Sequence, residues 1–121
     1  MAQDQAISAA QRQAEAEALR ATQEEVDELD TASNAVIALI KAGRLDDAEH
    51  AARELLVRYP EVHDGHDRLG MVHEARGQLR EAADCYRQAL AFIRAHAGDY
   101  DPEMEQMYLN LIAKLDPPTV S

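Results

Sequence analysis

Apolar residues recur along this chain at the spacing of helix faces. The clearest stripe lies near the C-terminal end and follows i, i+3, i+4, i+7 positions: Met104, Met107, Tyr108, Leu111, Ile112 and Leu115. Asp101 precedes it as an expected N-cap, and Pro102 suits the first helical position. Pro117 and Pro118 follow the stripe and end it. The pattern predicts a helix from Pro102 to about residue 115.

A second pattern is a repeat. The residues around Gly43 recur around Gly77, 34 positions later, and each glycine is followed by leucine at the second position and alanine at the fifth. Glycine suits both turns because it readily adopts positive φ after a helix. A period of 34 is typical of one helix–turn–helix unit in a repeat array. The pattern predicts two helix pairs, at about 31–42 with 45–59 and 62–76 with 79–96.

Residues 3–29 are rich in alanine, glutamine and glutamate and contain neither glycine nor proline, which favours a further helix. Its apolar stripe consists largely of alanines, so the helix needs a partner surface. Docking on the repeats, dimerisation and partial fraying at the first turns all remain open. Thr31 is the expected cap of the next helix, which brings the total to about six helices.

The two units resemble tetratricopeptide repeats, at about 29–62 and 63–96. Leu69-Gly70 reproduces the Leu-Gly pair of the family consensus, and Ala48 and Ala82 stand at its small-residue position, where the second helix of a pair crosses the first. At two other positions, where the consensus prefers tryptophan and tyrosine, this chain has His66 and His73 instead. The resemblance implies an all-α fold, a right-handed superhelix of antiparallel helix pairs with flanking N- and C-terminal helices.

Two repeats alone bury too little surface, so the flanking helices are expected to complete the array. The predicted organisation has four parts. They are an acidic N-terminal helix (1–30), two helical hairpins (31–97), a C-terminal capping helix (98–116) and a tail (117–121).

Charge excludes several functions. The net charge of −11 lies mainly on the flanks, because residues 31–97 contribute only −1. No basic face is available for nucleic acid, and an acidic membrane surface would repel the chain. The N-terminus has no basic and apolar signal pattern, and no apolar run is long enough to span a bilayer. We therefore expect a cytoplasmic protein that binds neither nucleic acid nor membrane.

Two groups of residues are candidates for chemistry. His63, Asp64, His66, Asp67 and His73 could be drawn as metal ligands, but their spacing demands no convergent site, and packing or surface histidines are the favoured interpretation. The single cysteine, Cys85, aligns with an alanine of the first repeat, and a mid-helix thiol lacks the activation that a nucleophile requires. No phosphate loop or metalloprotease motif is present. We expect no enzyme activity, no cofactor and no metal.

The resemblance implies a concave face, lined by the first helix of each pair, that holds a peptide or a helix of a partner protein. The residues it places there are Ser33, Asn34, Ile37, Ile40, Lys41, Asp67, Arg68, Met71 and Glu74. Ile37 and Met71 share one repeat position, which predicts a shared apolar strip. Ile37 also replaces the asparagine of the family's carboxylate-clamping members, so chaperone C-terminal tails are not expected ligands. Packing of this strip against the N-terminal helix is the competing interpretation.

The leading hypothesis is a protein-binding adaptor or scaffold that is not an enzyme and that can form a homo-oligomer. One alternative is a small acidic, secretion-type chaperone that holds an export substrate. A second is a structural module that dimerises through its N-terminal helix. The chaperone predicts a 1:1 complex with one unfolded client, whereas the dimer predicts a doubled mass without any partner.

Overall fold

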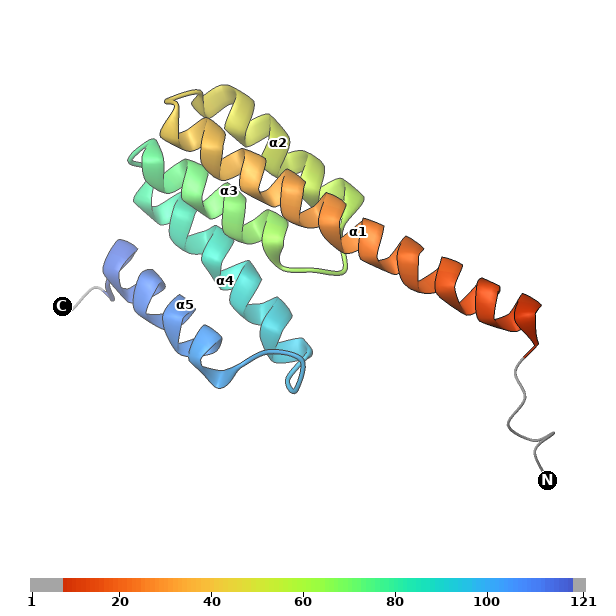
Figure 1. Cartoon of the computed structure of the whole chain (residues 1–121). Helices are drawn as coiled ribbons and strands as arrows, with labels where there is room; N and C mark the ends of the chain where they lie inside the picture. The colour runs from red at the N-terminus through yellow and green to blue at the C-terminus, as the bar shows by residue number, and fades with distance from the viewer. Residues whose placement is uncertain (1–7, 119–121) are drawn as a thin grey trace. The chain divides into compact units, whose positions relative to one another are not determined.

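This computed structural model describes residues 8–118, whose regular secondary structure is entirely helical. Five α-helices and no strands occur in that range (Figure 1): α1 (Ala9–Lys41), α2 (Leu45–Arg58), α3 (Asp64–Ala75), α4 (Leu79–Ala95) and α5 (Pro102–Leu115). The predicted all-α fold is confirmed. The expected helix start at residue 3 and the last three residues of the tail lie outside the described residues.

The first helix differs from the prediction. We expected a break before Thr31, but α1 is one continuous helix of 33 residues, and Thr31 lies within it. Neither glycine nor proline occurs between Ala9 and Lys41, so the sequence offers nothing that would stop a helix there. The described residues therefore form five helices, with the predicted N-terminal helix and the first repeat helix fused into one.

By its contacts, the chain divides into two units between Thr31 and Ala32. In the first unit, Ser8 and Gln11 form a capping box at the start of α1. The Ser8 hydroxyl accepts a hydrogen bond from the Gln11 amide at 3.1 Å, and the Gln11 side-chain oxygen accepts one from the Ser8 amide at 3.1 Å. Leu19 is 72% exposed and Val26 46% exposed. None of the helices described for residues 8–118 is both long and apolar enough to cross a bilayer.

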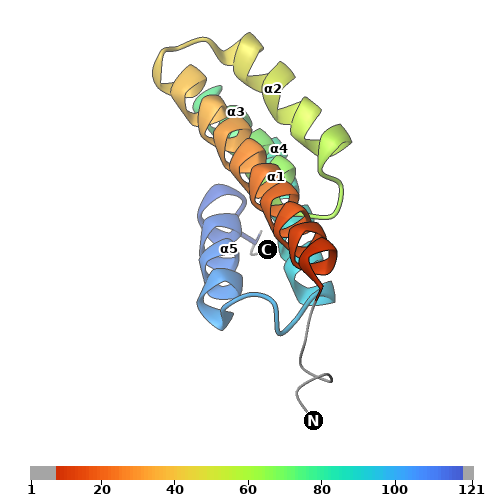
Figure 2. The same ribbon diagram turned by 45° about the vertical axis from the view of Figure 1, so that its right-hand side comes forward.

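The second unit contains residues 32–41 of α1 and the four following helices. α3 packs against both α2 and α4, and α4 packs against α5. Figure 1 shows α5 beside α4, and Figure 2 shows α2 and α5 on opposite sides of this unit. Its main buried cluster lies where α4 packs against α3 and α5: Ala82, Ala83, Tyr86, Ala89, Leu90, Ile93, Tyr108 and Leu115.

The two turns have the same backbone structure. Gly43 has φ +76° and Gly77 φ +78°, in the left-handed region that favours glycine. After α1, the Gly43 amide donates to the Ile40 carbonyl at 3.0 Å and the Arg44 amide to the Leu39 carbonyl at 2.9 Å, which is a Schellman motif. Both bonds recur at the same distances in the second turn, from Gly77 to Glu74 and from Gln78 to His73.

Small residues sit where the helices approach closely. Ala48 and Ala82 are fully buried, as their repeat position predicts. Gly65 and Gly70 of α3 allow an even closer approach. An added Cβ at Gly65 would lie 2.7 Å from a methyl carbon of Leu56, and one at Gly70 would lie 2.8 Å from the ring of Tyr86. The two glycines thus set the distance of α3 from its neighbours.

The last helix begins as predicted, with Pro102 in its first turn and Asp101 in the extended N-cap conformation, although the Asp101 side chain makes no capping hydrogen bond. Two ion pairs connect α5 and the residue that follows it to α4, Arg94 with Glu105 and Arg87 with Asp116, both at 2.7 Å. Most of the predicted stripe packs against α4. Met107 is the exception and is 44% exposed.

Candidate partner-binding face

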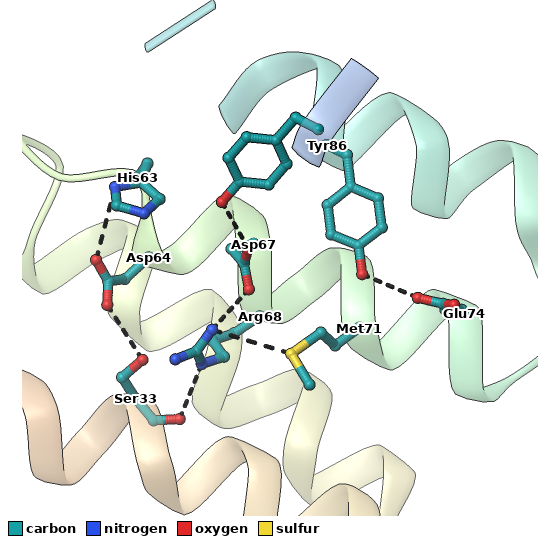
Figure 3. Close-up of polar contacts among 9 residues, drawn as sticks. Ser33, His63, Asp64, Asp67, Arg68, Met71, Glu74 and Tyr86 are labelled. Carbon is teal, nitrogen blue, oxygen red and sulfur yellow. Dashed lines mark hydrogen bonds and ion pairs between the residues drawn. The ribbon is translucent and has the colours of Figure 1, made fainter. Parts of the chain in front are cut away.

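A polar network joins three helices at the predicted concave face (Figure 3). Arg68 of α3 donates from Nε to the Ser33 carbonyl of α1 at 3.2 Å and from a terminal nitrogen to Asp67 Oδ1 at 2.6 Å. The Tyr108 hydroxyl of α5 donates to the other Asp67 oxygen at 2.6 Å. Asp67 therefore links α5 to Arg68, and Arg68 links α3 to α1.

Three further contacts extend the network. The Ser33 hydroxyl donates to Asp64 at 3.2 Å, and the Tyr86 hydroxyl donates to Glu74 at 3.0 Å. The sulfur of Met71 lies 3.9 Å from a terminal nitrogen of Arg68. Ser33 is only 2% exposed. Of the polar residues predicted for the groove, Ser33, Asp67 and Arg68 are thus brought together in one network, and Glu74 bonds to Tyr86 of α4.

The remaining predicted residues lie nearer the surface. Ile37 and Ile40 are partly buried, as is Met71, whereas Asn34 and Lys41 are exposed. Ile37 and Met71 occupy corresponding positions of α1 and α3, one repeat period apart. We refer to Ile37, Ile40 and Met71 as the apolar strip. Met71 also contacts the polar network, through its sulfur.

Burial governs the ionisation of the network tyrosines. It raises the pKa of Tyr108 well above the usual tyrosine value, and the negative charge of Asp67 raises it further. Burial likewise raises the pKa of Tyr86, with the Glu74 carboxylate as the next cause. Both hydroxyls stay protonated at neutral pH and can act as donors. Burial lowers the pKa of His66, which favours its neutral form.

The raised tyrosine pKa values predict an alkaline loss of stability. In the unfolded chain these tyrosines ionise near pH 10, but in the folded protein they resist ionisation. Their contribution is therefore complete below about pH 10 and is lost as the pH rises above it. Urea unfolding between about pH 8 and 11.5 should show a steeper decline for the wild type than for the Tyr86→Phe/Tyr108→Phe double variant. Equal slopes would contradict this.

The histidine cluster makes contacts within the protein. The His63 ring packs edge-on against Tyr100 with ring centres 5.1 Å apart, and His73 Nδ1 lies 2.7 Å from the side-chain oxygen of Gln78. Among residues 8–118, no three side chains of histidine, cysteine, aspartate or glutamate converge to hold a metal ion. The contacts of His63 and His73 are thus ring packing and a short side-chain contact, respectively.

Cys85 is buried in α4. Burial raises the pKa of its thiol, and the neighbouring charge of Asp84 raises it further. A thiol with a raised pKa remains protonated at neutral pH and is a poor nucleophile. Its burial agrees with the small, packed position that the repeat alignment predicts.

The structure also reveals a surface that the sequence analysis did not identify. An open pocket of about 480 Å³ lies along one face of α5, which we call the α5 outer face: Glu103, Gln106, Met107, Asn110, Leu111 and Lys114. Met107 and Leu111 belong to the packing stripe that the sequence predicts. The polar residues between them, at the same helical spacing, are the signal that could have revealed a second face.

A chain whose antiparallel helix pairs repeat one turn geometry at a fixed period is an α-helical repeat protein. Residues 63–96 match the family model of the Tetratricopeptide repeat. This match supports the predicted resemblance for the second unit, and tetratricopeptide repeats are in general protein-interaction modules. For residues 29–62, the resemblance is supported by the turn at Gly43, which has the same hydrogen bonds as the turn at Gly77. Comparison with curated proteins and with solved structures gave no match.

Proposed function

We propose that the chain is a non-enzymatic cytoplasmic adaptor that binds a peptide or an amphipathic helix of a partner protein on the apolar strip. The position of Ile37 and Met71 carries the proposal. They stand at one repeat position on α1 and α3, while their polar neighbours Asp67 and Arg68 are engaged in the internal network. A partner segment with two or three apolar anchors at helical or extended spacing fits such a strip.

The groups around the strip favour binding over catalysis. Asn34 and Lys41 are exposed and can provide polar contacts at its edge. Two residues that could act as a nucleophile or a base, Cys85 and Asp67, are buried or already hydrogen-bonded within the protein. Cys85 is buried with a raised thiol pKa, and the Asp67 carboxylate already accepts bonds from Arg68 and Tyr108. We therefore assign this face no catalytic residue.

Paired substitutions test the proposal. Because Ile37 and Met71 are only partly buried, Ile37→Glu/Met71→Glu should retain the helical circular dichroism spectrum while it places two charges on the strip. In capture from native cell extract, quantified by mass spectrometry, the variant should then bind about tenfold less of the partner than the wild type does. Val57→Glu is the matched control because Val57 is an apolar residue of α2 that is 81% exposed.

Unchanged capture by a folded Ile37→Glu/Met71→Glu variant would show that the partner binds elsewhere. The composition of the captured complex also separates the alternatives. A 1:1 complex with one unfolded client would favour a secretion-type chaperone, whereas a folded partner with a short bound segment would favour the adaptor.

A further inference from the structure

We propose that the α5 outer face is a self-association surface, on which α5 of a second copy of this chain packs antiparallel. This face lies on α5 and shares no residue with the apolar strip of α1 and α3. Its central side chains are apolar. Met107 is 44% exposed, Leu111 is partly buried beside it, and both line the open pocket.

The unpaired charges of α5 favour a second copy of this chain as the partner. Glu105, and Asp116 just beyond the helix, are paired with Arg94 and Arg87 of α4. Glu103 and Lys114 are different because both are exposed and neither makes an ion pair or hydrogen bond with any residue in the described part of the chain. They stand eleven positions apart, or about 16 Å along the helix, too far to pair with each other. The face therefore presents one unpaired charge of each sign.

An antiparallel second copy satisfies both charges at once. With a two-fold axis near the middle of α5, Met107 packs against Leu111 of the second copy, and Lys114 reaches Glu103 of the second copy. Each contact is made twice, as an isologous interface requires. The same arrangement places the negative end of each helix dipole beside the positive end of the other. The α5 outer face is thus complementary to itself in charge and in apolar contact.

The N-terminal segment is a poorer surface for self-association. Leu19 and Val26 are exposed there, but residues 9–31 carry seven acidic side chains and only two arginines. Two such segments side by side would repel each other. The α5 outer face carries one acidic and one basic side chain and has no such penalty.

The size of the surface predicts a weak dimer. A helix of 14 residues is about 21 Å long, so one antiparallel pair buries less than the ~1,200 Å² of a stable interface. We expect a monomer–dimer equilibrium in the micromolar range or weaker. It should be visible by sedimentation equilibrium of the full chain between about 1 and 500 µM.

A charge swap tests the geometry. Glu103→Lys places lysine opposite lysine and Lys114→Glu places glutamate opposite glutamate, so each single variant should dimerise about tenfold more weakly. Glu103→Lys/Lys114→Glu in one chain exchanges the charges and should restore the wild-type dissociation constant. An equimolar mixture of the two single variants should form a heterodimer, detectable by native mass spectrometry, because one chain is then basic and the other acidic at both positions.

Two control variants complete the design. Leu19→Glu should leave the dissociation constant unchanged, and so should Ile37→Glu, which tests the apolar strip separately. A wild-type chain that is monomeric at every concentration would overturn the proposal. It would also be overturned by a double charge swap that fails to restore the dimer, or by a Leu19→Glu variant that abolishes it.

Discussion

Replacing Asp67 by alanine is expected to destabilise the protein by about 3 kcal/mol. The carboxylate accepts hydrogen bonds from Arg68 and from the Tyr108 hydroxyl, both at 2.6 Å, and most of its surface is buried. Its removal leaves the buried Tyr108 hydroxyl without its acceptor and the partly buried Arg68 guanidinium without its carboxylate partner, which costs more than an exposed ion pair contributes. Urea unfolding followed by circular dichroism measures the loss.

Asp47→Ala is the matched control for this prediction. Asp47 pairs with Arg44 at 2.7 Å, but both side chains are more than half exposed, so its loss should cost less than about 0.5 kcal/mol. Asp67→Asn should fall between the two, because the amide oxygen can still accept one bond while the charge is lost. If Asp67→Ala costs no more than Asp47→Ala, the network does not hold the helices together.

The second large effect concerns Gly65. Substitution of glycine by alanine at negative φ usually stabilises a protein by about 0.4–1 kcal/mol. Here the added Cβ would lie 2.7 Å from Leu56 Cδ2 and 2.9 Å from the Leu56 backbone nitrogen. A side chain can move aside, but a helix backbone can shift only as a unit, so we expect Gly65→Ala to destabilise by about 2 kcal/mol. Urea unfolding again provides the measurement.

A double variant separates the two parts of this clash. Leu56→Ala in the same chain removes the side-chain contact but leaves the backbone nitrogen in place, so it should relieve only part of the strain from Gly65→Ala. An increase in stability for Gly65→Ala alone would show that α2 and α3 can separate at little cost.

Much of the second unit was predictable from local sequence. Gly43 and Gly77 mark turns because a left-handed residue is needed after each helix, and the structure places both at nearly the same φ. The buried alanines at 48 and 82 follow from the same repeat period as these glycines. Pro102 indicates a helix start because its φ suits the first turn.

Other features depend on interactions that a linear pattern does not contain. Tyr108 bonds to Asp67 across 41 residues, and only the packing of α5 on α4 brings them together. The sequence pattern therefore could not show that the carboxylate of Asp67, a predicted groove residue, also accepts hydrogen bonds from Arg68 of α3 and Tyr108 of α5. The continuity of α1 past Thr31 has a local cause, since neither glycine nor proline lies near that position to stop the helix.

Site-specific photo-crosslinking in the native cell tests the proposed binding surface most directly. A photoreactive residue would replace Ile37, Met71 or, as the control, Val57, which is 81% exposed on α2. If a partner binds the apolar strip, one partner protein should crosslink from positions 37 and 71, and position 57 should give none of it. Crosslinks to a common partner from position 57, with none from 37 or 71, would contradict the proposed function.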